Sequence, residues 1–536
     1  MKLRTILLVG ICALACTGAD AASYEHVSYD STQRYSRLVI DARLNDFYAN
    51  KNQMGFQTFT ENGEKISAPA GASRVRFDYV PGLVAKALIE AVDYYQTQSW
   101  ARPWFYSVEW YGNTYLYGVP STGGSLDDLN ATKMYFGLSD LTSQGSVFDN
   151  ETTYANAQWA MATATKGLSD HNDRYSISAS TLEDAAGGWF HKSSYVNQMW
   201  LDGQYMGPAL LAQLNNYGYS IVGIDNDGLI ANQFAICWNY LWNEEEKLLY
   251  HAMTASPGDS YSRDWQGVSA SEGIYHSAEY WGRACGWYFL ALVDVLEQFE
   301  KRQFPVLDSE GVQQYDSLCN LLRLQLNELA SGLAARQDPE TGCWYQLLAH
   351  DGTFYADRYQ GWPYPKTYNY LESSATCIFT AAYLKGMRLG LFNKDYSEVA
   401  RKAYRGIIEQ FLVKNSADDT DVHLISSCRS AGLGGSSRRD GSAAYYLLGS
   451  DVSVTSIDNP QTEGKVFGSF ILASTEYERR YMPISSEEEG IEEISADADS
   501  SSSMLNAHGP YDLWGRRITK KQRTFSIEGG RCVYHE

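Results

Sequence analysis

The stretch Gly82-Leu-Val-Ala-Lys-Ala-Leu-Ile-Glu-Ala-Val-Asp-Tyr-Tyr95 carries the clearest fold signal in this chain. Leu83, Ala87, Ala91 and Tyr94 recur at three- and four-residue spacing, which places them on one face of an α-helix. Comparable patterns begin near Asp127, Asn150, Pro208, Leu229, Tyr280, Gln314, Leu371, Tyr396 and Gly464. The sequence therefore predicts a succession of amphipathic helices.

Only short strand-like pieces interrupt these helices, for example Thr114 to Val119. About ten helices joined by glycine- and aromatic-rich loops predict an all-α domain. No repeat of fixed period accompanies them. The helical pattern, together with a secretion signal and an aromatic composition suited to carbohydrate, favours an α/α toroid.

The composition is that of a globular protein with an acidic balance. The 536 residues include 43 Lys plus Arg and 64 Asp plus Glu, a formal net charge of −21, with 44% hydrophobic residues. Such a balance argues against duplex nucleic acid and anionic lipid as partners, because both are bound through cationic surfaces. The 14 Trp and 40 Tyr suit stacking on sugar rings, although a large core uses aromatic residues equally well.

The first residues have the composition of a secretory signal. Lys2 and Arg4 precede an apolar run from Ile6 to Cys16, and Ala19-Asp20-Ala21 offers a small-residue cleavage site. We predict a signal peptide over residues 1–21 and export to the periplasm, the cell surface or the medium, without a membrane-spanning segment. A lipid anchor on Cys16 is the less favoured alternative, because Ala13 stands where a lipobox has a larger aliphatic residue.

Removal of the signal leaves seven cysteines, which are scattered and lack CxxC spacing. They predict neither a disulfide framework nor a zinc site, and most are expected to be small buried hydrophobic residues. They are Cys237, Cys285, Cys319, Cys343, Cys377, Cys428 and Cys532.

The composition changes at the carboxyl end. Residues 485–510 open with a serine-rich acidic run and are predicted to be a solvated linker between a domain over residues 22–484 and a tail over 511–536. In the tail, Tyr511 to Arg517 and Phe525 to Val533 are predicted to form two short strands. The tail resembles the YDLxGRRV…GxYIxxGKK endings of secreted proteins of the Bacteroidetes type, which implies a sorting function. A small hairpin without activity is the alternative.

The segment Gln198-Met-Trp-Leu-Asp202-Gly-Gln-Tyr-Met-Gly-Pro208 offers the best candidate for acid–base chemistry. Asp202 stands alone among Trp200, Tyr205 and Met206, and an unpaired carboxyl in such surroundings has its ionised form disfavoured by desolvation. Asp202 is therefore a candidate general acid. The alternative is an ordinary N-cap or turn aspartate before the helix that Pro208 opens.

Two further segments contain candidate site residues. In Trp281-Gly-Arg283-Ala-Cys-Gly-Trp287 the guanidinium could hold a carboxylate while the indole rings stack on a sugar, or Arg283 could simply pack over aromatic rings. In Leu126-Asp127-Asp-Leu-Asn130, Asp127 could either act in the site or cap the following helix.

The order of these and other motifs along the chain is specific. The motifs are LDxxN, GGWFHK, QMWLDGxYM, LLYHA, WGRxxGW, GxWYQ, NYLESSAT and CRxAGLGG…RDGS, spread from about Phe77 to Glu476. This order resembles glycoside hydrolase family 105, the unsaturated rhamnogalacturonyl hydrolases, which are related to the family 88 unsaturated glucuronyl hydrolases.

The resemblance implies an (α/α)6 barrel and a set of site residues. Asp202 matches the catalytic acid/base and Asp127 the second active-site aspartate. The positions expected to bind substrate are His191, His251, Arg283, Trp287, Trp281 and Trp200.

The chain departs from the family pattern at two places. Ala284-Cys285 replaces the usual Gly-Asn beside Arg283, and a polar Asp-His-Asn-Asp insertion at 170–173 is expected to form a loop at the cavity rim.

The implied substrate is an oligosaccharide whose non-reducing end is a 4,5-unsaturated uronic acid. Asp202 would protonate C4 of the enol ether and then deprotonate the water that adds at C5. Asp127 is expected to raise the apparent pKa of the carboxyl pair by like-charge repulsion. No cofactor is expected, and His191 and His251 lack the spacing of a zinc motif.

Other activities remain open alternatives. One alternative is a glucuronyl hydrolase acting on ulvan- or glycosaminoglycan-type products. Another is a non-catalytic sugar-binding toroid, against which the presence of both Asp127 and Asp202 argues. The aglycone and the oligomeric state are not determined by the sequence.

Overall fold

The computed structural model describes residues 23–49, 52–66, 75–301, 309–361, 366–434, 438–449, 452, 454–484, 524–528 and 531–535. The predicted signal peptide, the acidic linker and the strand predicted at Tyr511 to Arg517 lie outside these residues. The chain divides into two compact units, residues 1–489 and 490–536.

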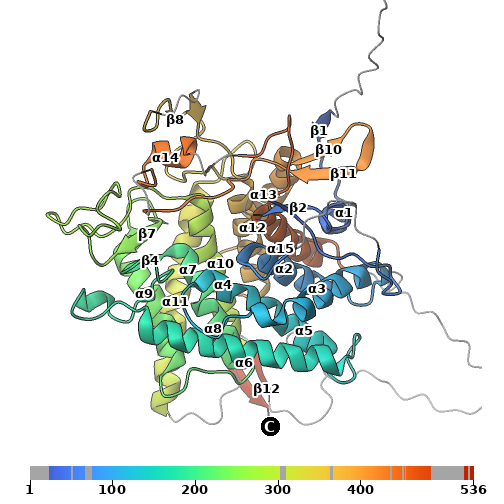
Figure 1. The fold of residues 1–536 in the computed structure, drawn as a ribbon, viewed down its shortest axis with the longest axis horizontal. Helices are drawn as coiled ribbons and strands as arrows, with labels where there is room; N and C mark the ends of the chain where they lie inside the picture. The colour runs from blue at the N-terminus through green and yellow to red at the C-terminus, as the bar shows by residue number, and fades with distance from the viewer. Residues whose placement is uncertain are drawn as a thin grey trace, which may run out of the picture. The chain divides into compact units, whose positions relative to one another are not determined.

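The first unit is an (α/α)6 barrel, and short strands connect its helices (Figure 1). Its helices are α1 (Tyr35–Arg43), α2 (Tyr79–Tyr95), α3 (Arg102–Thr114), α4 (Leu126–Asn130), α5 (Met134–Thr142), α6 (Glu151–Arg174), α7 (Leu201–Met206), α8 (Pro208–Asn216), α9 (Asn226–Leu241), α10 (Gly282–Lys301), α11 (Ser309–Ala335), α12 (Ser373–Arg388), α13 (Ser397–Gly406), α14 (Ala443–Leu448) and α15 (Gly464–Tyr481).

Burial separates inner from outer helices. In α10 every residue from Gly282 to Phe299 is buried, and α12 is buried from Ser373 to Gly386. Helices that are covered all round belong to the inner layer. The outer helix α13 instead buries one face through Ala400, Ala403 and Tyr404. Helix α15 packs against α2 and α12, and α12 packs against α10, so these four helices form a continuous inner wall.

The sequence signals for the helices are confirmed at several boundaries. Asn150 caps α6 by accepting hydrogen bonds from the backbone N–H groups of Thr152 and Thr153. Pro208 occupies the first turn of α8, where its missing N–H is not needed.

Two local expectations are wrong. The predicted strand at Thr114 to Val119 is the end of α3 followed by a 3-10 turn over Leu116–Gly118, because Leu116 and Val119 bury their side chains at three-residue spacing. The predicted loop at 170–173 is the last part of α6, in which Asp170 accepts a hydrogen bond from the Gly123 N–H. His171 is fully buried and its Nε2 contacts the Phe190 carbonyl at 2.9 Å, so the insertion is anchored inside the fold.

The strands are short and lie in the loops. They are β1 (Tyr24–His26), β2 (Phe47–Ala49), β3 (Asn52–Met54), β4 (Gln198–Trp200), β5 (Trp242–Asn243), β6 (Leu248–Leu249), β7 (Ala252–Thr254), β8 (Tyr355–Ala356), β9 (Thr367–Tyr368), β10 (Leu412–Asn415) and β11 (Asp418–Leu424). The antiparallel pair β4–β7 sets Trp200 opposite Ala252. This pairing fixes the segment before Asp202 against the segment after His251.

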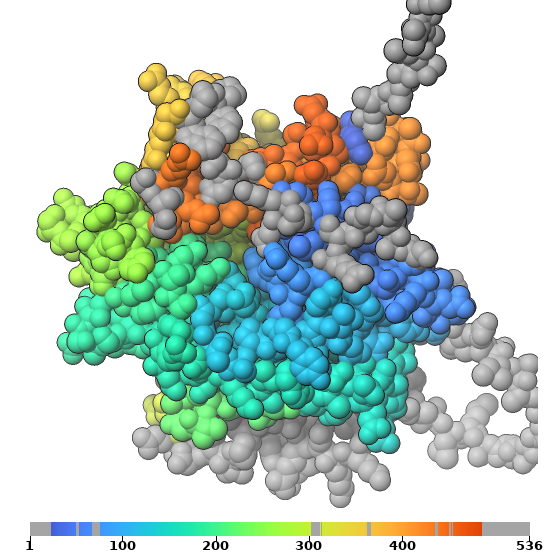
Figure 2. All heavy atoms as spheres, in the orientation of Figure 1, coloured from blue at the N-terminus to red at the C-terminus, as the bar shows by residue number. Residues whose placement is uncertain are grey.

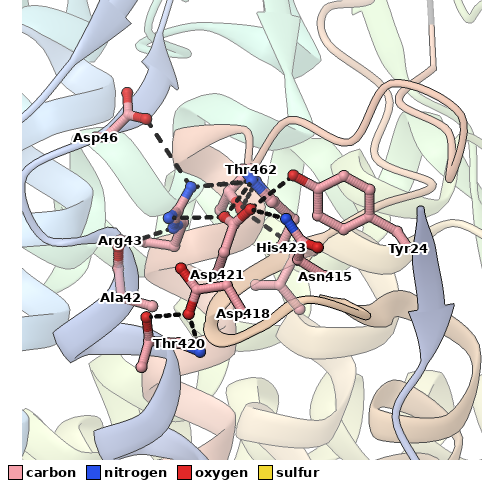
Figure 3. A network of polar contacts seen from close by, with 11 residues as sticks. Tyr24, Ala42, Arg43, Asp46, Asn415, Asp418, Thr420, Asp421, His423 and Thr462 are labelled. Atoms are coloured by element: carbon pink, nitrogen blue, oxygen red, sulfur yellow. Dashed lines mark hydrogen bonds and ion pairs between the residues drawn. The ribbon is translucent and has the colours of Figure 1, made fainter. Parts of the chain in front are cut away.

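A second sheet, in the order β1-β10-β11, ties the described start of the chain to the barrel. Figure 3 shows the polar contacts beside it, which we call the N-terminal network. Asp421 accepts hydrogen bonds from Tyr24 at 2.7 Å and from Arg43 Nη2 at 3.2 Å. His423 lies 3.0 Å from Arg43 Nη1 through Nε2 and 3.3 Å from Thr462 Oγ1 through Nδ1. These contacts join β1, α1 and β11.

The second unit contains the antiparallel hairpin of β12 (Thr524–Glu528) and β13 (Arg531–His535). The single strand predicted over Phe525 to Val533 is therefore two strands. They are separated in the sequence by Gly529-Gly530, a pair that favours a tight hairpin turn.

The described cysteines agree with the expectation of small buried residues. Cys237, Cys285, Cys343, Cys377 and Cys428 are free and buried, whereas Cys319 is half-buried. No helix within the described part of the chain has the length and apolar composition to cross a bilayer.

Candidate active site

Asp127 stands in the first turn of α4, where Ser125 supplies the cap. The Ser125 hydroxyl accepts the hydrogen bond from the Asp128 N–H, so Asp127 is not the capping residue. A β-bridge between Ser125 and Lys192, with a hydrogen bond from the Leu126 N–H to the His191 carbonyl, holds the GGWFHK segment against α4. This pairing brings His191 and Lys192 to Asp127.

The Asp127 carboxylate is flanked by two basic side chains. Its Oδ1 lies 3.2 Å from His191 Nε2, and its Oδ2 lies 2.6 Å from Lys192 Nζ. Burial by itself raises the pKa of Asp127, but the attraction of His191 and Lys192 outweighs this effect and holds the pKa well below its usual range. The rise expected for the apparent pKa of the carboxyl pair is therefore not found at Asp127, because His191 and Lys192 dominate its surroundings.

Asp202 stands in the first turn of α7, directly after β4. The Leu201 N–H donates to the His251 carbonyl, and Asp202 Oδ2 lies 3.3 Å from His251 Nε2. The Asp202 side chain is 15% exposed and His251 is fully buried. Asp202 is thus not the isolated carboxyl that the sequence suggested, since LLYHA and QMWLDG meet in space.

Tyr446 orients His251. Its hydroxyl lies 2.6 Å from His251 Nδ1, and burial raises the pKa of Tyr446 well above its usual value, which keeps the hydroxyl protonated. A hydroxyl that donates to Nδ1 leaves the ring hydrogen on Nε2, the nitrogen that lies 3.3 Å from Asp202 Oδ2 without a hydrogen bond to it. Tyr446 follows the RDGS motif, and the sequence analysis did not assign it a role.

Several buried polar atoms around these pairs make no hydrogen bond within the described residues. They are His191 Nδ1, Asp202 Oδ2, His251 Nε2 and Trp287 Nε1. His191 Nδ1 faces α7, since a Cβ atom at Gly203 would lie 3.2 Å from it. Buried polar atoms are usually satisfied, and a group of unsatisfied ones is typical of a site that acts on a ligand.

Tyr79, at the start of α2, is a half-buried residue of this site that sequence reasoning missed. Burial raises the pKa of its hydroxyl well above the usual value, Arg283 opposes the rise, and Asp127 and Asp202 reinforce it. Tyr79 therefore lies within electrostatic reach of both carboxylates. Its place in an ordinary helical pattern offered no signal for this role.

Arg283 is held by the protein itself. It is 2% exposed, and its Nη1 donates to the Cys428 carbonyl and, at 3.2 Å, to Ser374 Oγ. Glu372 accepts hydrogen bonds from the Cys428 N–H at 2.8 Å and from Ser374 Oγ. The WGRxxGW, NYLESSAT and CRxAGLGG motifs thus meet in one buried frame. The sequence predicted that the guanidinium would hold a substrate carboxylate, whereas the structure shows it bound to groups of the protein.

The three tryptophans expected to bind substrate are buried. Trp287 is fully buried, with Tyr205 stacked on it at 4.7 Å between ring centroids. Trp281 lies under Arg283 at 4.8 Å and donates to Gln346 Oε1 at 3.0 Å. Both rings are covered by protein groups, so the expectation that they offer free faces to a sugar is not met.

Trp200 has a different position, between the two histidine–aspartate pairs and a cavity. Its ring centroid lies 5.1 Å from that of His191, 5.2 Å from that of His251 and 4.6 Å from that of Tyr195. The cavity has a volume of about 470 Å³ and is lined by Ser194, Tyr195, Gln198, Tyr261, Leu433, Gly434 and Arg439. Leu433 and Tyr195 line the cavity and pack in one cluster with Trp200, so this indole lies behind the cavity lining and next to His191 and His251.

A buried lysine connects the two aspartate segments. Lys133 ends the 3-10 turn that follows α4, and its Nζ donates to the Tyr205 carbonyl of α7 at 2.5 Å. Lys133 is buried, which lowers the pKa of its amine well below the usual value. The segment that carries Asp127 is thereby fixed to the helix that carries Asp202.

No group of three or more His, Cys, Asp or Glu side chains suited to a metal ion occurs within the described residues. The candidate site contains two aspartate–histidine pairs, Lys192 beside Asp127, the buried Lys133 and several tyrosines.

Comparisons with known proteins agree with this architecture. Residues 50–481 match the profile of Glycosyl Hydrolase Family 88. The chain is 31% identical over 206 residues to Protein Atu3128 of Agrobacterium fabrum, which covers 37% of this chain and 76% of that protein. The same figures apply to a 24.9 kDa protein in the picA locus of Rhizobium radiobacter.

Solved structures give a similar result. A family 105 glycoside hydrolase of C. acetobutylicum superposes with a TM-score of 0.57 at 25% identity, over 83% of this chain and 100% of that one. A possible family 105 member from Salmonella enterica superposes with a TM-score of 0.53 at 18% identity, over 84% and 95% of the two chains, and shows the shared fold.

Proposed function

The chain belongs to glycosyl hydrolase family 88, and from this premise we propose that it removes a 4,5-unsaturated uronic acid from the non-reducing end of oligosaccharides. The observation that carries the proposal is the pair Asp202–His251 beside the pair Asp127–His191, each with buried polar atoms that make no hydrogen bond within the described residues.

Asp202 is the proposed acid/base. Its proton is transferred to C4 of the enol ether, and positive charge develops on C5 and the ring oxygen. Water adds at C5 and gives its proton to the Asp202 carboxylate, which restores the acid. The resulting hemiketal opens to a ketone at C5, the exposed hemiacetal at C1 collapses, and the aglycone leaves. One carboxyl group serves both proton transfers, unlike the usual pair of glycosidase carboxylates.

Asp127 has a different proposed role. Its lowered pKa keeps it ionised at neutral pH, so it is suited to stabilise the positive charge near C5 and not to donate a proton. Lys192 is 31% exposed and lies beside Asp127, whereas Arg283 is 2% exposed. Lys192 is therefore the better placed cation for the uronate carboxylate.

His251 is the proposed orienter of Asp202. Tyr446 holds the ring through Nδ1, and Nε2 lies 3.3 Å from Asp202 Oδ2 without a hydrogen bond between them, so the imidazole is near enough to steady the carboxyl during turnover. The Trp281 and Tyr446 rings that surround His251 exclude water from this side of the site.

The preferred substrate within this proposal is an unsaturated galacturonyl unit linked to rhamnose, as produced from rhamnogalacturonan and pectin. The support is the motif order, which resembles the unsaturated rhamnogalacturonyl hydrolases, together with the superposition on a family 105 enzyme. An unsaturated glucuronyl unit from ulvan or glycosaminoglycans is the alternative. The basic, apolar and small-residue composition of residues 1–21 supports the further proposal that the enzyme acts outside the cytoplasm.

The test is incubation of the purified protein with unsaturated galacturonyl-rhamnose, unsaturated ulvan disaccharide and unsaturated glycosaminoglycan disaccharide. Hydration of the enol ether removes its ultraviolet absorbance, so turnover is read directly. We expect the highest kcat/KM with the galacturonyl-rhamnose. The proposal is contradicted if none of the three substrates loses its absorbance. If the Asp202→Asn variant is then no slower than the wild type, a sugar-binding toroid is indicated.

A further inference from the structure

The short helix α7, which carries Asp202 in its first turn, depends on other segments for its position. It has six residues, and Gly207 caps it by donating to the Gly203 carbonyl at 3.0 Å. Pro208 has no N–H and cannot extend the backbone hydrogen bonds of α7. The last carbonyls of a helix have no donor within the helix, so they need one from elsewhere.

Lys133 supplies such a donor at the carboxyl end of α7. Its Nζ donates to the Tyr205 carbonyl at 2.5 Å and lies 3.4 Å from the centroid of the Tyr205 ring. One residue therefore offers the amine both an acceptor and an aromatic face. At the other end of α7, the Leu201 N–H donates to the His251 carbonyl. The helix is thus held at both of its ends.

The contact joins the two aspartate segments by a short path along the chain. Lys133 closes the 3-10 turn that follows α4, six residues after Asp127, and Tyr205 stands three residues after Asp202. Helices α4 and α7 are neighbours (Figure 1), and Figure 2 shows the light-blue part of the chain, which includes α4, adjoining the blue-green part near residue 200. A change at this contact would therefore move Asp202 relative to Asp127.

The ring of Tyr205 extends the contact to the inner wall of the barrel. It stacks on Trp287 of α10 at 4.7 Å between ring centroids, and Trp287 in turn meets Tyr79 edge-on at 6.3 Å. The carboxyl end of α7 is therefore packed between Lys133 on one side and Trp287 on the other.

Lys133 makes no ion pair within the described part of the chain, although acidic side chains lie near it. Asp294 pairs with Lys385 at 2.6 Å, and Glu90 pairs with Lys86 at 2.9 Å. Lys133 is 3% exposed, and its burial lowers the pKa of the amine well below the usual value. The amine therefore serves α7 as a hydrogen-bond donor and does not serve as a counter-ion.

We propose that Lys133 is a positioning residue for the hydrolysis, because its amine holds α7 where the Asp202 carboxyl has the distance from Asp127 that turnover requires. The inference rests on the proposed function, since it assumes that Asp202 is the acid/base. Misplacing a reacting group by about 1 Å costs up to about 10²-fold in rate. Lys133 is buried behind Tyr205, so its loss lowers kcat and leaves KM nearly unchanged.

Lys133→Met tests the contact, because it keeps much of the side-chain length and removes the donor. We expect kcat per folded protein to fall by about 10–100-fold, with KM within about twofold of that of the wild type. Lys133→Gln keeps an N–H donor on a shorter side chain and should recover part of the lost kcat. The substrate is whichever of the three unsaturated disaccharides the wild type turns over fastest, and near-ultraviolet circular dichroism measures the folded fraction.

Lys301→Met is the matched control for stability. Lys301 lies at the end of α10 and pairs with Glu297 at 2.8 Å, without contact to α7. Its replacement should lower the urea midpoint and leave kcat per folded protein at the wild-type value. A fall of kcat confined to the Lys133 variants separates positioning from a general loss of stability.

The outcomes separate two failures. A wild-type kcat in Lys133→Met, an equal fall of kcat in Lys301→Met, or a loss that appears in KM and not in kcat would each overturn the role of Lys133 alone. If Lys133→Met does not fold, Lys133→Gln decides, and an unchanged kcat in that variant overturns the role. Absence of wild-type turnover with all three disaccharides would overturn the proposed function and this inference with it.

Discussion

The active site and the N-terminal network contain the same kinds of residue, yet they differ in how completely their polar atoms are satisfied. In the N-terminal network, both carboxylate oxygens of Asp421 and both ring nitrogens of His423 contact protein groups (Figure 3). In the active site, His191 Nδ1, His251 Nε2 and Asp202 Oδ2 make no such hydrogen bond. The first cluster is saturated and holds chain segments together, whereas the second retains capacity for a substrate.

The largest contrast is expected when one aspartate of each cluster is replaced. Asp202→Asn should lower kcat/KM by about 10²–10⁴-fold, because an amide cannot deliver or accept the proton. Asp421→Asn should retain the turnover of the wild type and lower its stability. The measurements are the loss of enol-ether absorbance and denaturant unfolding of both variants. Similar turnover in the two variants would contradict the view that only the Asp202 cluster takes part in catalysis.

Replacement of Arg283 tests whether this buried motif residue stabilises the fold, as the N-terminal network does, or binds substrate. Because the protein satisfies its guanidinium, Arg283→Met should lower the free energy of unfolding by about 3–5 kcal/mol by leaving buried acidic partners uncompensated. The check is urea denaturation alongside kinetics of the folded fraction. A variant with wild-type stability and a raised KM would instead support the substrate-binding role inferred from sequence.

His423 should reveal the N-terminal network through the pH dependence of stability. Burial, reinforced by Arg43, lowers the pKa of His423 to about 4 in the folded protein, below its ordinary value of 6.5. The folded state therefore takes up the proton less readily than the unfolded chain. The stabilisation is complete above pH 6.5 and is lost as pH falls towards 4.

Between pH 7 and pH 4.5 the wild type should lose about 2 kcal/mol more than His423→Gln, which has no imidazole to titrate. Guanidinium unfolding at the two pH values measures this difference. Parallel losses in the two proteins would contradict the assignment of His423.

The smallest expected effect is on the pH profile and concerns the cation beside each aspartate. Lys192→Met removes the lysine charge that helps to hold the pKa of Asp127 low, so, besides weaker binding of the uronate, the acid limb of the kcat/KM profile should move to higher pH. Arg43→Met should leave the profile in place and lower stability. A profile that is unchanged in Lys192→Met would mean that Asp127 does not have to be ionised during turnover.

Local sequence patterns predicted the helices well because amphipathic spacing and capping act over a few residues. Helix α6 begins after the Asn150 cap and α8 begins at Pro208, as the sequence indicated. The failures at 114–119 and 170–173 arose where tertiary burial of Leu116 and His171 overrode a locally strand-like or loop-like composition.

The candidate site was predicted in part. The motifs identified Asp127, Asp202, His191 and His251, and the structure brings these four side chains together in two pairs. Tyr79, Tyr446 and Lys133 were missed because nothing in their own segments distinguishes them from helix residues. The expectation for Trp287 and Arg283 was misleading, because a motif shows which residues occur together but not which of their faces remain uncovered.

By itself, the sequence determined the all-α class and the order of the helices, and it singled out Asp127 and Asp202 as candidate site residues, because periodicity and motif order are properties of the chain. Only the tertiary structure decided the electrostatic state of Asp127, the pairing of Asp202 with His251 and the contact of Lys133 with the Tyr205 carbonyl. The physical reason is distance. Coulomb interactions, desolvation and cavities depend on which segments meet in space, and the segments that meet here are separated by tens to hundreds of residues.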